Sequence, residues 1–294
     1  MAEAVHTGRR RMSFAALSQA LRKALWRTPF MVATAGSVLA VAVIWVLFPA
    51  IAPHDADLID GSRSLIGPDS GHWLGTDQLG RDVFSRVIDG ARTGLLGPLI
   101  LAAATTAAST VIALVAGYLG GRVDAMTGRI IEVLYSVPPT IVAIVVVGVT
   151  GGGWWTAIVV LLVFGLPANV RLARAAVIVR ARLPYVEAAR TSGLSGVRII
   201  GCHLLPAITP FVVAVFFLTF TYGIVDLSAL SFLGLGVPPG AADWGRMIAE
   251  NRSNLFQNAW ATVAPAIALV LIAVSTNIIG DWIYSRYESH GRSR

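Results

Sequence analysis

Lysine and cysteine are almost absent from this sequence, and each absence excludes a class of site. Lys23 is the only lysine and it follows Arg22, whereas a phosphate-binding P-loop needs a lysine directly after glycine. We therefore expect no ATP site and no bound cofactor in this chain. Cys202 is the only cysteine, which excludes an intrachain disulfide framework and any multi-cysteine metal site.

Histidine is also sparse, and its spacing argues against metal binding. No two histidines stand four residues apart, the spacing that places two ligands on one helix face. The sequence therefore predicts no metal site and no metal catalysis. The five histidines are His6, His54, His72, His203 and His290.

Charged residues make up only 13% of the chain, against about 25% in soluble proteins. Hydrophobic residues account for 55%, so lipid is the expected solvent. The net charge of +7 is compatible with nucleic-acid binding. The arginines instead cluster in alternate loops between apolar stretches, which is typical of a membrane protein, and we expect no nucleic-acid partner.

Apolar stretches long enough to cross a bilayer occur along most of the chain. A membrane core of about 30 Å needs roughly 20 apolar residues in a helix. The apolar stretch that covers about 130–176 is too long for one span. We divide it at Gly151-Gly152-Gly153, which predicts a tight hairpin. The fold class is therefore an all-α integral membrane protein with six transmembrane helices, at about 30–52, 94–121, 130–150, 154–176, 207–235 and 262–284.

Arginine placement predicts the orientation of these spans. With a cytoplasmic N-terminus, 17 of the 23 basic residues fall in cytoplasmic segments, in agreement with the positive-inside rule. Both termini are then cytoplasmic, in the plasma (inner) membrane. Ala50-Ile51-Ala52 resembles a signal-peptidase site, but the apolar run before it is too long for a signal peptide, so we expect no cleavage.

These assignments divide the chain into five parts. A basic cytoplasmic leader occupies 1–29 and the first transmembrane helix 30–52. An extracytoplasmic segment with an amphipathic helix follows at 53–92. The core of five helices covers 93–284 and includes a cytoplasmic loop at 177–206, and a cytoplasmic tail covers 285–294.

The extracytoplasmic segment contains a polar motif before its amphipathic helix. Thr76 or Asp77 is a suitable N-cap for that helix, which we expect to lie on the membrane surface or at the mouth of the helix bundle. The aspartates between Asp55 and Asp82 lack EF-hand spacing, so a solvated acidic face is favoured over a calcium site. Farther along the chain, Pro238-Pro239-Gly240 is expected to end the fifth span.

The segment from Pro184 to Pro206 predicts two short helices that meet at Gly193. Helices this short are marginal in water, so the elbow must pack on something. Ala188 and Ala189 offer a shallow patch on the first helix, and the second carries an apolar stripe of Val197, Ile200 and Leu204. From these residues alone, a cytoplasmic protein partner and the lipid interface are equally good candidates.

This elbow resembles the EAA loop of ABC importer permeases. The resemblance rests on Glu187-Ala188-Ala189, Gly193 six residues after the glutamate, and an apolar residue, Leu205 and Pro206 at the end of the loop. It differs at Ala207, where many relatives have asparagine. The resemblance implies an ATPase-coupling loop that consists of Glu187, Ala188, Ala189, Gly193, Ile200, His203, Leu205 and Pro206. The first four would be the coupling contacts, and Leu205-Pro206 would be the junction to the fifth span.

The chain is further similar to the C-type permease subunit of dipeptide and oligopeptide ABC transporters, from about Trp26 to Asp281. Two stretches carry this similarity: the 74–86 motif, with Gly75, Thr76, Asp77, Gly80, Arg81 and Asp82, and the 230–245 segment, with Pro238-Pro239 and Trp244-Gly245. The tail after Asp281 does not match. The similarity implies a type I ABC importer permease fold.

It also implies an assembly. The expected partners are a homologous B-type permease subunit, two ABC ATPase subunits or a fused pair that bind ATP and Mg²⁺, an extracytoplasmic peptide-binding protein and membrane lipid. The expected substrate is a di- or oligopeptide, although similar permeases carry nickel complexes or haem. In such assemblies the EAA elbow sits in a cleft of the ATPase and moves with it.

Two other functions are less favoured by the sequence. A stand-alone secondary transporter should show an internal repeat and charged residues at midplane, and Asp226 is nearly alone in the spans. A role for Asp226 in the transport pathway and a helix–helix hydrogen bond are both open interpretations. A membrane-embedded enzyme needs a cluster of acidic residues and histidine within the spans, which this sequence lacks.

Overall fold

Helices form most of the described part of the chain. The structure, a computed structural model, describes residues 29–291, and within them it contains helices and connecting loops without a β-sheet. The predicted leader therefore lies almost entirely outside the described residues. The helices are α2 (Pro29–Leu47), α3 (Val83–Leu119), α4 (Gly121–Tyr135), α5 (Pro139–Val149), α6 (Trp154–Ala181), α7 (Pro184–Thr191), α8 (Gly196–Ile199), α9 (Leu205–Phe232), α10 (Trp244–Asn251) and α11 (Trp260–Gly291).

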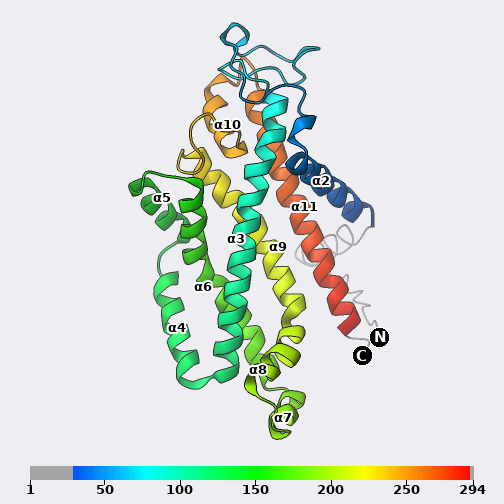
Figure 1. The fold of residues 1–294 in the computed structure, drawn as a ribbon, viewed down its shortest axis with the longest axis vertical. Coiled ribbons are helices and arrows are strands. Elements are labelled where there is room, and N and C mark those ends of the chain that lie inside the picture. The colour runs from blue at the N-terminus through cyan, green and yellow to red at the C-terminus, as the bar shows by residue number, and fades with distance from the viewer. Residues whose placement is uncertain (1–28, 292–294) are drawn as a thin grey trace, which may run out of the picture.

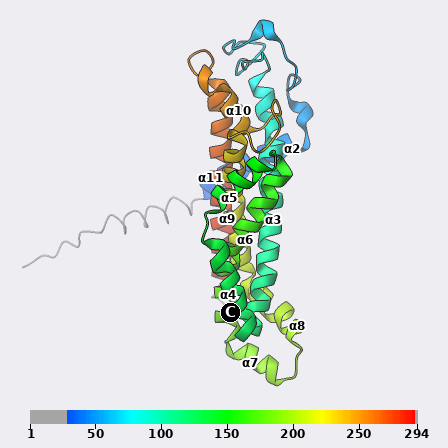
Figure 2. The ribbon, with the colours of Figure 1, turned by 90° about the vertical axis from the view of Figure 1, so that its left-hand side faces the viewer.

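Four long helices run side by side and form the bundle. Figures 1 and 2 show α3, α6, α9 and α11 along the long axis, with α2 inclined against α3 and α11. The 53–82 loop and α10 cover one end, and α7 and α8 lie at the other. The described residues contain five helices that can cross a membrane, or six spans when the bent pair α4 and α5 is counted as one. The all-helical fold with about six spans is thus confirmed.

The second span differs from its predicted boundaries. We expected a separate surface helix followed by a span at 94–121, but α3 is one continuous helix from Val83 to Leu119. Arg86, Asp89 and Arg92 precede the predicted start of the span, and they do not interrupt the helix. Arg86, one of them, is completely buried in a polar network instead of facing a membrane surface.

The third span, predicted as a helix at 130–150, is broken. The helices α4 and α5 are bent by 68° at Ser136-Val137-Pro138. Pro138 has φ −57° and ψ 125°, an extended conformation, because Pro139 disfavours helical geometry in the residue before it. The two prolines therefore end one helix and begin another.

Glycines form the turn before α6 and the turn after α9. Gly151, Gly152 and Gly153 all have positive φ, so the predicted hairpin before α6 is confirmed. The prediction that Pro238-Pro239-Gly240 ends the fifth span is wrong, since α9 ends at Phe232. Gly234 has φ 81°, and the N–H groups of Gly234 and Leu235 donate to Ser231 O and Leu230 O in a Schellman motif.

Three apolar clusters hold the bundle together. One surrounds Trp244 and joins α2, α3, α9, α10 and α11. A second joins α3, α5, α6 and α9 around Leu161. The third packs α3, α6 and α9 against the α7–α8 elbow. Polar sites at the two ends of the molecule are therefore built on packed apolar supports.

Candidate functional site

The α7–α8 elbow is shaped by its proline and glycine residues. Leu183 is extended because it precedes Pro184, and Pro184 occupies the first turn of α7. At the other end Gly193 has φ 79°. The N–H groups of Gly193 and Leu194 donate to Arg190 O at 3.0 Å and Ala189 O at 3.2 Å, a second Schellman motif. The chain therefore turns sharply at Gly193, as predicted.

The second arm of the elbow does not end at Pro206. The residues from Gly196 to Phe232 form one continuous helical segment. It includes a π-helical turn from Ile200 to Leu204, directly before Leu205-Pro206. Proline has no N–H to continue the α-helical hydrogen bonds, and the wider turn accommodates it. Leu205-Pro206 therefore connects the elbow rigidly to the fifth span.

The elbow packs on its own chain, which corrects an expectation. The sequence suggested a protein partner or the lipid interface as the surface that buries the elbow, but four of its residues are buried against α3, α6 and α9 of the same chain: Val186, Ala189, Ile199 and Leu204. Tyr118 of α3 also lies close to the elbow, where its ring edge is 3.1 Å from the position of a Cβ on Gly196. The Arg190 guanidinium stacks over the Tyr118 ring, 4.7 Å from its centroid.

The faces of the elbow differ from those predicted. Ala188 is exposed and Ala189 is buried, so only one alanine lies on the free surface. The predicted apolar stripe is also divided, because Leu204 faces the core while Val197 is 82% exposed. The Glu187 side chain is 69% exposed, with Arg190 4.0 Å away as its nearest ionic partner. The free face of α7 is therefore presented by Glu187 and Ala188.

The remaining predicted elbow residues differ in their burial. Ile200 and His203 are partly buried, whereas Leu205 and Pro206 are exposed. His203 stacks on Tyr185, with ring centroids 6.5 Å apart, and its Nδ1 is buried without a hydrogen-bond partner among the described residues. Tyr185 and His203 thus join the two arms of the elbow through an aromatic contact.

The 74–86 motif contains a tight, buried turn. Gly75 and Gly80 have φ 71° and 74°, and a Cβ on either would lie 2.3 Å or less from a backbone oxygen. Asp77 Oδ1 accepts from the N–H groups of Leu79 and Arg81, at 2.8 and 3.0 Å. Both positions therefore require glycine, because φ is positive and there is no room for a Cβ atom.

Neither predicted helix cap performs that role. Asp82 caps α3 by accepting from the Ser85 N–H at 2.8 Å. The Thr76 hydroxyl instead bonds to Arg63 O, and Asp77 holds the turn. The expected solvated acidic face is also wrong for two members, since Asp77 and Asp82 are 1% and 3% exposed. Asp77 and Asp82 are thus structural carboxylates within a buried network.

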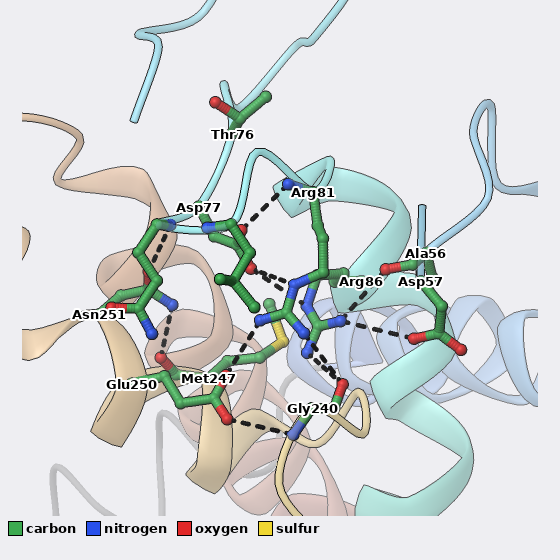
Figure 3. A network of polar contacts seen from close by, with 12 residues as sticks. Ala56, Asp57, Thr76, Asp77, Arg81, Arg86, Gly240, Met247, Glu250 and Asn251 are labelled. Carbon is green, nitrogen blue, oxygen red and sulfur yellow. Dashed lines mark hydrogen bonds and ion pairs between the residues drawn. The ribbon is translucent and has the colours of Figure 1, made fainter. Parts of the chain in front are cut away.

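Two buried arginines link this turn to the segment around α10 (Figure 3). Arg81 Nε donates to Asp77 Oδ2 at 2.7 Å, and Arg81 Nη2 donates to Glu250 Oε2 at 3.1 Å. Arg81 and Arg86 both donate to Gly240 O, at 3.1 and 3.2 Å. Buried charges are tolerated when they are paired and hydrogen-bonded. Arg81 meets this condition, whereas Arg86 Nε is buried without a hydrogen bond to the described residues. Sequence reasoning found Arg81 but missed Glu250 and Gly240, about 160 residues away, because no local pattern identifies such partners.

Further contacts fix the same junction. Asn258 Nδ2 donates to the carbonyl oxygens of Leu74 and Thr76, at 3.1 and 2.9 Å. The Trp244 indole donates to Val87 O at 2.9 Å and packs on Gly90 and Gly94 of α3. Through these contacts the motif connects the 53–82 loop, α3 and α10 into one polar and aromatic unit.

Carboxyl pKa values in this unit reflect burial and pairing. Burial alone would raise the pKa of Glu250, but the Arg246 hydrogen bond and the Arg81 charge outweigh it, so that pKa lies below its ordinary value. Burial raises the pKa of Asp243, which caps α10 through the Arg246 N–H at 3.1 Å. Glu250 is therefore the group that favours the charged form at this junction.

Two histidines meet near the start of α3, contrary to the expectation that histidines are scattered. The rings of His54 and His72 have centroids 4.8 Å apart, and His72 Nδ1 lies 2.9 Å from Asp82 Oδ1. Asp226, by contrast, lies alone on α9 and is partly buried. Its carboxylate has no hydrogen bond or ion pair to other described residues, so the helix–helix hydrogen bond that the sequence left open is not formed among them.

Comparison with known proteins extends these observations. Residues 109–289 match the family described as "Binding-protein-dependent transport system inner membrane component". A probable D,D-dipeptide transport system permease protein, DdpC of Escherichia coli (strain K12), is 31% identical over 87% of this chain and 86% of its own length. A glutathione transport system permease protein, GsiD of Pectobacterium atrosepticum, is 33% identical over 85% of this chain and 84% of its own length.

A solved structure supports the fold independently. A chain of the MetNI methionine ABC transporter in an inward-facing conformation superposes with a TM-score of 0.54 and 19% sequence identity, covering 68% of this chain and 95% of that chain. The family match covers more than half of the sequence and includes the elbow, α9 and α11. This chain therefore belongs to the family of inner-membrane components of binding-protein-dependent transport systems.

Proposed function

We propose that this protein is a permease subunit of an ABC importer that carries short peptides into the cytoplasm. Family membership makes it a membrane component and not an ATP-hydrolysing subunit. The names of two relatives specify a D,D-dipeptide and glutathione, which are both small peptides. The match to such permeases over most of both chains supports a peptide substrate over nickel, haem or an ion-driven secondary transporter.

The observation that carries the proposal is the two-faced elbow. Val186 and Ala189 anchor α7 to the bundle, while Glu187 and Ala188 remain on the surface. An eight-residue helix is marginal in water by itself, so packing must maintain its shape. The bundle holds this surface rigidly, which suits docking into a partner's cleft. The small side chain of Ala188 permits close approach of the partner.

The assembly follows from this role. We propose that two ATPase subunits, separate or fused, dock on the elbows of this chain and of a homologous permease, and that they bind the ATP and Mg²⁺. An extracytoplasmic binding protein would deliver the peptide at the opposite end. The arginine distribution supports placing the elbow and both termini in the cytoplasm.

Movement of the elbow would reach the pore through α9. The segment from Gly196 to Phe232 is helical throughout, so displacement at Ser195 is transmitted along the fifth span. Asp226 lies on that span, and we propose that it lines the pathway in the assembled pore. Asp226→Asn should then lower the peptide transport rate while retaining ATPase binding.

The experiment uses the full complex reconstituted in proteoliposomes with its binding protein and peptide. Gly193→Val places a β-branched residue at φ 79°, which should abolish peptide-stimulated ATP hydrolysis by distorting the elbow. Ala188→Trp leaves the fold intact because Ala188 is exposed, and it should also prevent stimulation by blocking docking. Both variants should remain in the membrane fraction.

A matched control distinguishes docking from general damage. Ala40→Trp makes the same substitution at an exposed position of α2, outside the elbow, and should preserve stimulation. Unchanged stimulated hydrolysis in Ala188→Trp and Gly193→Val would refute the coupling role. Transport of nickel or haem, but no peptide, by the wild-type complex would refute the proposed substrate.

A further inference from the structure

Three side chains with metal-binding atoms meet at the extracytoplasmic end of α3. His54 follows α2 in sequence, His72 precedes the buried turn, and Asp82 caps α3. One ligand atom from each lies within 4.8 Å of the others. His72 Nδ1 is 2.9 Å from Asp82 Oδ1, and His54 Nδ1 is 3.8 Å from Asp82 Oδ2. Both imidazoles therefore direct the same nitrogen toward one carboxylate.

Ser85 holds two members of this group in place. Asp82 Oδ2 accepts from Ser85 N–H at 2.8 Å and from Ser85 Oγ at 2.6 Å. The backbone N–H of His54 donates to the same Ser85 oxygen at 3.1 Å. Such outer contacts orient ligands in established metal sites. They leave Asp82 Oδ1 directed at His72, while His54 Nδ1 is too far from Asp82 for a hydrogen bond.

The separations suit a small divalent ion. Zinc lies about 2.0–2.2 Å from nitrogen and oxygen ligands, so tetrahedral ligand atoms are roughly 3.3 Å apart. The observed separations of 2.9 and 3.8 Å fall on either side of this value. Two imidazoles and a carboxylate form a donor set suited to zinc and its transition-metal neighbours, with a fourth position left for water.

Access and electrostatics also favour a cation. His54 lines a pocket of about 400 Å³ whose wall carries Asp55, Asp57 and Asp89. Carboxylates around a solvent-filled pocket raise the local concentration of cations. His54 itself is 38% exposed at its side chain, so an ion in this pocket can reach its ring.

We propose that His54, His72 and Asp82 bind one divalent transition-metal ion of the zinc class. The ion would replace the hydrogen bond between His72 Nδ1 and Asp82 and bring His54 into the same coordination shell. It would tie the segment around His54 to the N-terminus of α3, alongside the buried turn. This site is independent of the elbow and of the transported substrate.

Arg63 competes with this ion. Its Nη1 lies 3.0 Å from His72 Nε2, which suits an imidazole protonated only on Nδ1. A metal on Nδ1 leaves Nε2 as a donor, and two donors cannot face each other. The Arg63 side chain is 55% exposed and free to move outward when the ion binds. Arg63→Gln should therefore increase affinity, since the glutamine oxygen accepts from Nε2.

The experiment measures Zn²⁺ binding to the full-length chain in detergent, purified with an affinity tag that contains no histidine. The wild type should retain about one equivalent of zinc and unfold at a higher temperature when zinc is added. His54→Ala should weaken binding at least tenfold and remove the thermal shift. Because His54 is a partly exposed residue, this variant should fold normally without metal.

The matched control is His203→Ala, which removes a histidine of the elbow and should leave zinc affinity unchanged. Substitution with Co²⁺ should give a visible spectrum of tetrahedral nitrogen and oxygen coordination, absent in His54→Ala. The proposal is overturned if the wild type retains no zinc, or if His54→Ala binds it as tightly as the wild type. Weaker zinc binding by Arg63→Gln would overturn the competition.

Discussion

At the scale of single residues, burial decides what the polar motif does. Arg81 has 2% of its side chain exposed, and its partners Asp77 and Glu250 come from opposite sides of the junction. Removing one partner of a buried pair leaves an uncompensated charge, which costs more than the pair contributes. Arg81, Asp77 and Glu250 therefore hold this end of the molecule together.

Glu250→Gln tests this interpretation through pH. Glu250 has a pKa below its ordinary value of 4.5, so its charged form stabilises the folded state above that pH, and the contribution disappears as pH falls through the folded-state pKa. The variant should lose about 2–3 kcal/mol at neutral pH. Its deficit in thermal unfolding temperature relative to wild type should narrow below pH 4.5.

Glu187→Gln is the control for this measurement, since the Glu187 side chain is 69% exposed and its pair with Arg190 is weak. It should change stability by no more than about 0.5 kcal/mol at any pH. A Glu250→Gln deficit of equal size at neutral and acidic pH would contradict the role assigned to its charge.

At the scale of elements, α3 connects the two candidate regions. Asp82 caps its first turn beside the buried motif, and Tyr118 near its last turn contacts the elbow. The helix is continuous over 37 residues despite Pro98. The elbow is therefore supported by three long helices: α9 continues its second arm, and α3 and α6 pack beside it.

Tyr118→Ala tests the support from α3. The substitution removes the ring beneath Arg190 and beside Gly196, so α7 should open more often and its backbone amides should exchange hydrogen faster. We expect roughly a fivefold to thirtyfold acceleration within residues 184–191, the effect of about 1–2 kcal/mol. Hydrogen exchange read by mass spectrometry provides the measurement.

Val197→Ala is the comparison, because Val197 is 82% exposed and contributes little packing. Exchange in α7 should match the wild type in this variant. If Tyr118→Ala also leaves exchange unchanged, α3 does not support the elbow.

At the scale of the whole molecule, orientation relative to the membrane determines function. The elbow and the buried motif lie at opposite ends of the bundle (Figure 1), so they face opposite compartments when the bundle spans the bilayer. Basic residues favour the elbow end in the cytoplasm. Coupling to an ATPase requires this orientation.

The single cysteine makes this orientation measurable without engineering. Cys202 lies in the π-helical turn of the elbow and is exposed. A membrane-impermeant thiol reagent should label it in inverted membrane vesicles and leave it unlabelled in intact spheroplasts. The variant Cys202→Ser with Ser70→Cys should show the reverse pattern, because Ser70 is exposed at the other end. Labelling of Cys202 from outside would contradict the proposed topology.

The sequence by itself determined the apolar spans, the glycine turns and the elbow. These features follow from local rules, since hydropathy requires a membrane span and a positive φ favours glycine. The same rules placed the turn at Gly193 and the hairpin at Gly151-Gly152-Gly153. They also excluded an ATP site, because the chain lacks the lysine that such a site needs.

Only the tertiary structure decided which side chains face inward. Two neighbouring alanines have the same hydropathy, so Ala188 and Ala189 look alike in sequence but differ in burial. The tertiary structure also decided the long-range partners. Arg81 contacts Glu250, which lies 169 residues away in the sequence, and the rings of His54 and His72 contact each other. These contacts depend on how distant elements pack together, and no periodicity along the chain encodes that packing.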